Sequence, residues 1–145
     1  MKRLGVFVAA GLLLAAVPSF AQTVGTCPRG GGANQPPPAR VLFDLGSAQL
    51  RADNKPVIAQ AAATAKARQV SVICLIGHTD KLGDKAFNEK LARSRAQTVA
   101  AQLIRDGVPA NHLYIVADPE AFGNMSLGKE DASVVDRKVT IFFSR

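Results

Sequence analysis

The sequence predicts an α/β fold in which two helices pack on one face of a mixed β-sheet. Short apolar runs typical of strands alternate with two longer segments of helical periodicity, in the order β-α-β-α-β-β. The first three strands are separated by helices, which favours crossover connections, whereas the last strand follows a long loop. The chain has 145 residues. Without the N-terminal segments described next, roughly a hundred remain, enough for one hydrophobic core.

Residues 1–21 have the pattern of a secretory signal peptide. A basic start at Lys2 and Arg3 precedes an apolar run over residues 4–17, and small residues stand at Ser19 and Ala21. The apolar run is too short to span a bilayer comfortably. We expect cleavage after Ala21 and a mature protein outside the cytoplasm.

Residues 22–40 are predicted to be a linker. Glycines fill positions 30–32 and prolines fill positions 36–38, a composition that favours flexible or polyproline II chain over a packed core. No predicted strand precedes the glycines and no Lys-Ser/Thr pair follows them, so a phosphate-binding loop is not indicated. The folded domain is therefore expected to cover residues 41–145.

The boundaries of the elements follow from capping and breaking residues. The first helix is expected to begin through Asp53 or Asn54, with Pro56 in its first turn. Asp84 is a suitable N-cap for the second helix, and Gly107 is a stop signal. The predicted strands cover residues 41–45, 70–76, 112–117 and 138–143. The predicted helices cover residues 53–67 and 85–106.

An arginine falls on the apolar side of the second helix. At about 100° per residue, Asn88 and Arg95 lie in the middle of the apolar stripe, whereas Arg93 lies on the opposite face. A charge on the core side needs a partner, and the carboxylates of Asp80 and Asp44 are the candidates. Such a pair at the mouth of a fold can clamp a ligand that carries both an amine and a carboxylate. The predicted stripe consists of Phe87, Leu91, Ala92, Ala96, Val99, Ala100 and Leu103.

The residues around this arginine also resemble a known family. Their types and spacing are similar to the signature of the OmpA-like domain, the C-terminal domain of outer membrane protein A, which binds peptidoglycan. The resemblance extends over about residues 41–143. The matching residues are Phe43, Asp44, Ser47, Leu50, Thr79, Asp80, Gly83, Asn88, Leu91, Arg95, Ala96, Val99, Arg137 and Val139.

The resemblance implies non-covalent binding of peptidoglycan in the periplasm, at the cell wall or outer membrane. By resemblance, Asp80 binds the amine and Arg95 the carboxylate of diaminopimelate in the stem peptide. An arginine suits the second role because its planar fork can hold a carboxylate through two hydrogen bonds. Asn88 is implied either at the pocket wall or as a cap on the Asp80 loop. Thr79 is implied to contribute mainly backbone groups.

Two further residues enter the candidate site through the same resemblance. Asp44 ends the first strand, and Arg137 is expected either to line the pocket or to pair within the core. Asp136 and Lys138 depart from the family pattern, which has an asparagine and a second arginine at these positions. The alternative function is an interaction module of an envelope complex, with outer-membrane or other envelope proteins as partners. The presence of Asp80, Asn88 and Arg95 together favours wall binding.

The formal net charge of the chain is +7, and its basic residues are scattered. A basic surface suits anionic partners such as cell-wall carboxylates. The basic residues form no arginine-rich runs interleaved with aromatics, so nucleic-acid binding is not indicated.

Two cysteines, Cys27 and Cys74, would enter an oxidising compartment. They can form an intramolecular disulfide, Cys27 can pair with another chain, or Cys74 can be a buried small apolar residue within its strand. A lipid anchor at Cys27 is disfavoured, because Val24-Gly25-Thr26 does not resemble the usual sequence before a lipidated cysteine.

An enzyme is not expected. Only His78 and His112 can serve as imidazole bases, and neither has a recognisable partner at catalytic spacing. No HExxH or CxxC motif supports zinc, and no nucleophile elbow surrounds a serine. We therefore expect neither a cofactor nor a metal.

Overall fold

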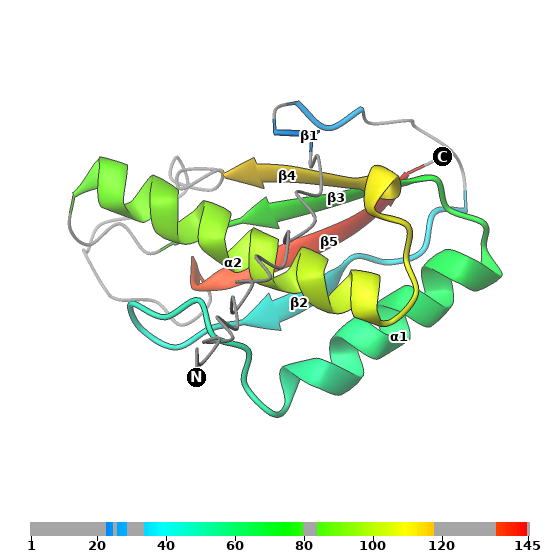
Figure 1. Cartoon of the computed structure of the whole chain (residues 1–145), viewed down its shortest axis with the longest axis horizontal. Helices are drawn as coiled ribbons and strands as arrows, with labels where there is room; N and C mark the ends of the chain where they lie inside the picture. The colour runs from blue at the N-terminus through cyan, green and yellow to red at the C-terminus, as the bar shows by residue number, and fades with distance from the viewer. Residues whose placement is uncertain (1–22, 25, 29–33, 80–83, 118–135, 145) are drawn as a thin grey trace, which may run out of the picture.

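The structure, a computed structural model, describes residues 23–24, 26–28, 34–79, 84–117 and 136–144 (Figure 1). All six predicted elements are present, and each boundary lies within three residues of its predicted position. A two-residue strand, β1 (Thr23–Val24), precedes them, and a short 3₁₀ turn, η1 (Ala110–His112), leads into β4. The six elements are β2 (Ala39–Leu42), α1 (Asn54–Ala67), β3 (Val72–Gly77), α2 (Lys85–Arg105), β4 (Leu113–Ala117) and β5 (Lys138–Ser144).

The sheet is mixed, and its strand order is β1-β4-β3-β5-β2. β3 pairs with β4 in parallel, whereas β5 is antiparallel to both β3 and β2. β2, β3 and β4 therefore run in the same direction. Their C-terminal ends and the start of β5 lie at one edge of the sheet. We call this edge, which is defined by Leu42, Gly77, Ala117 and Lys138, the carboxyl edge.

Both helices lie on one face of the sheet, as Figure 1 shows. Alternate strand residues such as Ile73, Leu75 and Ile141 join one buried cluster with Ile58 of α1 and Val99 of α2. Removing each such side chain from water contributes about 1.5–3 kcal/mol to stability. The predicted α/β fold, with two helices on one face of a mixed sheet, is confirmed.

The helix ends combine expected and unexpected contacts. Asp84 caps α2 as predicted, because its Oδ2 accepts a hydrogen bond from the backbone N–H of Phe87 at 3.0 Å. Gly107 follows α2 with a φ of +94°, a conformation that glycine adopts readily. Asp53 occupies the N-cap position of α1 without a side-chain capping bond. Instead, Asn54 donates from Nδ2 to the carbonyl of Leu42 at 2.7 Å, which ties the start of α1 to the end of β2.

The predicted linker contains structure that its composition did not indicate. β1 pairs in parallel with β4, with Thr23 opposite Tyr114 and Val24 opposite Ile115. β2 also begins inside the predicted linker, at Ala39. Residues 23–24 and 39–40 of the predicted linker are therefore in β-strands. The physical reason is that an edge strand offers unpaired backbone groups with which a nearby segment can pair.

A disulfide joins Cys27 to Cys74, with 5.9 Å between their Cα atoms. Of the alternatives open for these cysteines, the structure has the intramolecular bond. Cys74 lies between Ile73 and Leu75 of the core cluster, so its side chain points to the face of the sheet that carries no helix. Cys27 is therefore held on the face opposite the helices. Within the described ranges, no helix is long and apolar enough to cross a membrane.

Candidate functional site

Arg95 occupies the centre of the carboxyl edge and is completely buried. Its Nε donates to the carbonyl of Ser47 at 2.8 Å, its Nη1 to the carbonyl of His78 at 3.1 Å and its Nη2 to the carbonyl of Asp44 at 3.0 Å. The guanidinium also lies over the ring of Phe43, 5.4 Å from the ring centroid. The three carbonyls come from two segments that follow different strands. Arg95 therefore fastens the ends of β2 and β3 to α2.

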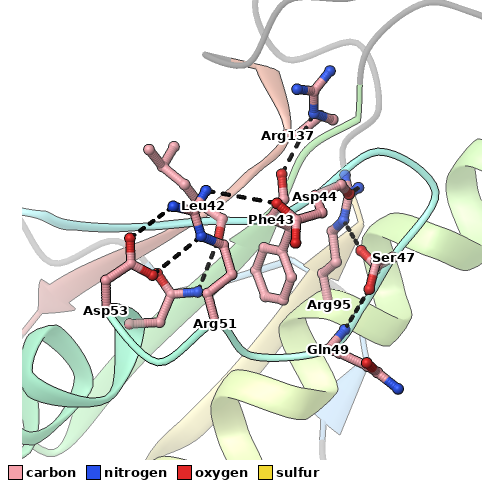
Figure 2. Close-up of polar contacts among 10 residues, drawn as sticks. Leu42, Phe43, Asp44, Ser47, Gln49, Arg51, Asp53, Arg95 and Arg137 are labelled. Atoms are coloured by element: carbon pink, nitrogen blue, oxygen red, sulfur yellow. Dashed lines mark hydrogen bonds and ion pairs between the residues drawn. The ribbon is translucent and has the colours of Figure 1, made fainter.

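The side chains of Asp44 and Arg95 do not meet as the sequence suggested. Asp44 reaches Arg95 through its backbone carbonyl, and its carboxylate, 71% exposed, lies 3.6 Å from Nη1 of Arg51. Arg51 also holds Asp53 through Nε and Nη2, at 3.1 and 2.8 Å. Figure 2 shows Arg51, Arg95 and Arg137 around the segment from Phe43 to Ser47. Arg51 was not among the predicted site residues, because no motif spacing indicates it.

Arg137 fastens the start of β5 to the same segment. Its backbone carbonyl accepts from the N–H of Phe43 at 2.8 Å, and its Nε donates to the carbonyl of Phe43 at 3.4 Å. Lys138 belongs to β5, and its carbonyl accepts from the N–H of His78 at 2.8 Å. Because Lys138 alternates with the core residue Val139, its side chain points away from the helices. The departure from a second arginine at this position therefore lies on the face opposite Arg95.

Thr79 and Asn88 are both buried at this edge, with 3% and 6% of their surface exposed. Oγ1 of Thr79 has no hydrogen-bond partner in the part of the chain that the structure describes. A buried hydroxyl of this kind normally has a partner, so a polar group of a ligand would satisfy it. Asn88 lies in the first turn of α2, on the same side as Arg95. Asp80, the predicted partner of the ligand amine, lies outside the described residues.

The end of β3 lies close to the backbone of α2. A Cβ atom added to Gly77 would collide with the backbone carbonyl of Ala92. Ala92 precedes Arg95 by less than one helical turn, so this contact brings the carbonyl of His78 within reach of the guanidinium. Glycine at position 77 is therefore required by the packing at the site.

Gly77→Ala is expected to lower the free energy of unfolding by about 1–3 kcal/mol, because β3 must move away from α2. Urea denaturation followed by circular dichroism measures this change. The double variant Gly77→Ala with Ala92→Gly should not recover, because the obstacle is a backbone carbonyl that glycine also carries. Recovery in the double variant, or an unchanged midpoint in the single one, would contradict the close approach.

The predicted apolar stripe of α2 is wrong at its N-terminal end. Phe87 is 56% exposed and Leu91 is only half-buried. The first turn of α2 extends past the end of β3, so the sheet gives Phe87 nothing to pack on. The buried residues of α2 are Asn88, Ala92, Arg95, Ala96, Val99, Ala100 and Leu103.

The described residues contain no group of three or more His, Cys, Asp or Glu side chains that could hold a metal ion. The site instead offers a buried cation, a buried hydroxyl and several exposed polar groups at one edge. This arrangement suits the binding of a small polar ligand with an anionic group.

Comparison with known sequences identifies a family to which this chain is similar. The family model described as the OmpA family matches residues 42–139. Outer membrane protein A of Bordetella avium is 33% identical over 76 residues, which are 52% of this chain and 39% of that protein. The outer-membrane lipoprotein YfiB of Pseudomonas aeruginosa is 32% identical over 77 residues, which are 53% of this chain and 46% of that protein. The chain thus matches less than half the length of these relatives.

Solved structures show the same fold. The peptidoglycan-associated lipoprotein of Burkholderia pseudomallei superposes with a TM-score of 0.64 at 26% identity, covering 73% of this chain and 90% of that one. The OmpA-like domain of FopA1 from Francisella tularensis superposes with a TM-score of 0.64 at 20% identity, covering 72% and 70%. The second likeness concerns the fold alone.

Proposed function

The chain belongs to the OmpA family, and from this premise we propose that it binds peptidoglycan non-covalently in the periplasm. The observation that carries the proposal is the buried Arg95, which gathers the ends of β2 and β3 at the carboxyl edge. One relative that is 26% identical over this domain is named a peptidoglycan-associated lipoprotein. The role is that of a binding module without catalytic chemistry.

The ligand group is proposed to be the diaminopimelate of the stem peptide. Its free end carries an ammonium and a carboxylate, so it needs one acceptor and one donor of opposite charge. Arg95 supplies the positive charge, and Asp80 is proposed as the acceptor. Because three carbonyls fix the orientation of the guanidinium, a carboxylate that reaches it gains a charge-assisted bond to a donor already held in place.

The other site residues have supporting roles in this proposal. Oγ1 of the buried Thr79 would receive or donate a hydrogen bond to the ligand. Asn88 would form the pocket wall on α2. Asp44 and Arg137 would shape the rim, Asp44 through its exposed carboxylate and Arg137 through its hold on Phe43.

Export to the periplasm is part of the same proposal. A disulfide between Cys27 and Cys74 fits an oxidising compartment. A sulfur bonded in this way cannot also carry a thioether-linked lipid, so we propose that the protein has no lipid anchor at Cys27. Association with the outer membrane would then pass through the cell wall or through partner proteins.

The purified protein is expected to sediment with peptidoglycan sacculi that contain diaminopimelate and much less with lysine-type sacculi. Acetylation of the free amine should weaken binding of a soluble stem peptide by roughly tenfold or more, because a carboxylate facing an amide loses its charge partner. Asp80→Ala should remove this discrimination. Co-sedimentation and calorimetric titration measure the two effects.

Glu89→Ala is the matched control, because Glu89 is a half-exposed carboxylate on the outer side of α2. It should leave the preference for the free amine intact. Equal binding of both peptides by the wild type would reject the role of Asp80. Failure to bind any sacculi would favour the alternative of an interaction module for envelope proteins.

A further inference from the structure

Two large apolar side chains are exposed beside the proposed site. Leu45 is 64% exposed and Phe87 is 56% exposed. Leu45 belongs to the turn whose carbonyls, on Asp44 and Ser47, accept from Arg95. Phe87 belongs to the first turn of α2, the helix that carries Arg95. The two exposed side chains therefore come from the two segments that Arg95 joins.

Phe87, Leu91 and Arg95 lie in one row along α2, at positions i, i+4 and i+8. Burial increases along this row from the exposed Phe87 through the half-buried Leu91 to the fully buried Arg95. Along the helix axis, residues 87 and 95 are about 12 Å apart, at 1.5 Å per residue. The row is a partly apolar path along α2 that begins at an exposed ring and ends at the buried residue Arg95.

This path suits one particular part of peptidoglycan if the proposed function holds. Two amino acids and a lactyl group separate diaminopimelate from the sugar ring of muramic acid. Two extended residues span about 7 Å, and the lactyl group adds to this length. A stem peptide that has its diaminopimelate at Arg95 and follows the row outward would bring its sugar to about the position of Phe87.

We propose that the ring of Phe87 packs against the pyranose ring of the muramic acid that carries the bound stem peptide. One face of such a sugar presents C–H groups, and the face of an aromatic ring carries partial negative charge that attracts them. This inference rests on the proposed function and adds a contact to the glycan strand, which the charged pocket alone does not provide.

Calorimetric titration with two soluble ligands tests the sugar contact. One ligand is the N-acetylmuramyl tripeptide that ends in diaminopimelate, and the other is the same tripeptide without the sugar. The wild type is expected to bind the sugar-bearing ligand roughly three- to tenfold more tightly. Phe87→Ala should bind both ligands equally, with the affinity that the wild type has for the bare tripeptide. Phe87→Tyr should keep the preference.

Phe142→Ala is the matched control. Phe142 is also a partly exposed phenylalanine, 38% exposed, but it pairs with Cys74 in the sheet and points to the face without helices. It should keep the preference for the sugar-bearing ligand. A preference that survives in Phe87→Ala, or that is absent from the wild type, would overturn the sugar contact and leave the proposed function standing. Failure of the wild type to bind either ligand would reject the proposed function itself.

Discussion

Arg95→Ala is expected to weaken binding to peptidoglycan sacculi by roughly thirtyfold or more and to lower the free energy of unfolding by about 3–5 kcal/mol. The loss of binding follows from the proposed contact with the ligand carboxylate. The loss of stability follows from the carbonyls of Asp44, Ser47 and His78, which lose a charged donor together. Co-sedimentation with sacculi and urea denaturation measure the two effects.

Two further substitutions test this role of Arg95. Arg93→Ala is the control, and Arg95→Lys keeps the charge while changing the shape of the side chain. Arg93→Ala removes an arginine that is 35% exposed and lies 3.6 Å from Glu89 one turn away. It should change the unfolding free energy by no more than about 0.5 kcal/mol and leave binding intact. Arg95→Lys keeps the charge but lacks the fork that reaches three carbonyls, so it should be less stable than the wild type. Equal binding by folded Arg95→Ala and Arg93→Ala would reject the site.

That Asp44, Thr79 and Arg95 lie close together was predictable, because their positions depend on chain direction and helical phase. Asp44 and Thr79 each follow a strand that precedes a helix, and such strands run in parallel within one sheet. Their C-terminal ends therefore meet at one edge. The helical phase of Arg95 placed it on the core side, and the structure confirms its burial. These features follow from local periodicity and topology, which the sequence carries directly.

The contacts of Arg95 with Asp44, Ser47 and His78 could not be predicted, because they are made with backbone carbonyls. Every residue type has a backbone carbonyl. The identities of Ser47 and His78 therefore do not indicate that their carbonyls accept hydrogen bonds from Arg95. A carboxylate partner was expected for Arg95 because a sequence specifies side-chain types but not which backbone groups come close together. The need for glycine at position 77 is similar, since it arises from the backbone of Ala92 in a distant segment.

The N-terminal segment was misjudged for a different reason. Glycines and prolines are frequent in residues 22–40, and composition alone favours a flexible chain. One covalent bond outweighs that tendency, because Cys27 is bonded to the central strand through Cys74. β1 has only two residues, and its pairing with β4 would be weak without a nearby anchor.

Cys27→Ala is expected to lower the free energy of unfolding by about 3–4 kcal/mol, because the disulfide closes a loop across 47 residues of sequence. Cys74 remains as a buried thiol in this variant and continues to pack as a small apolar group. Wild-type protein unfolded in urea with a reducing agent should show the same loss as the variant. Equal stability of the oxidised wild type and the variant would contradict this role of the bond.

Binding to sacculi should nevertheless survive in Cys27→Ala. This variant is therefore a control for Arg95→Ala, because it loses similar stability at a position away from the site. Cys74 points to the face without helices and precedes Gly77 by three residues, so the disulfide lies away from the carboxyl edge. Cys27→Ala and Arg95→Ala are thus expected to lose similar stability, while only the second loses binding. Co-sedimentation of both variants, under conditions where both are folded, makes the comparison. If both lose binding, the effect of Arg95→Ala reflects a weakened fold, and the assignment of Arg95 to the ligand fails.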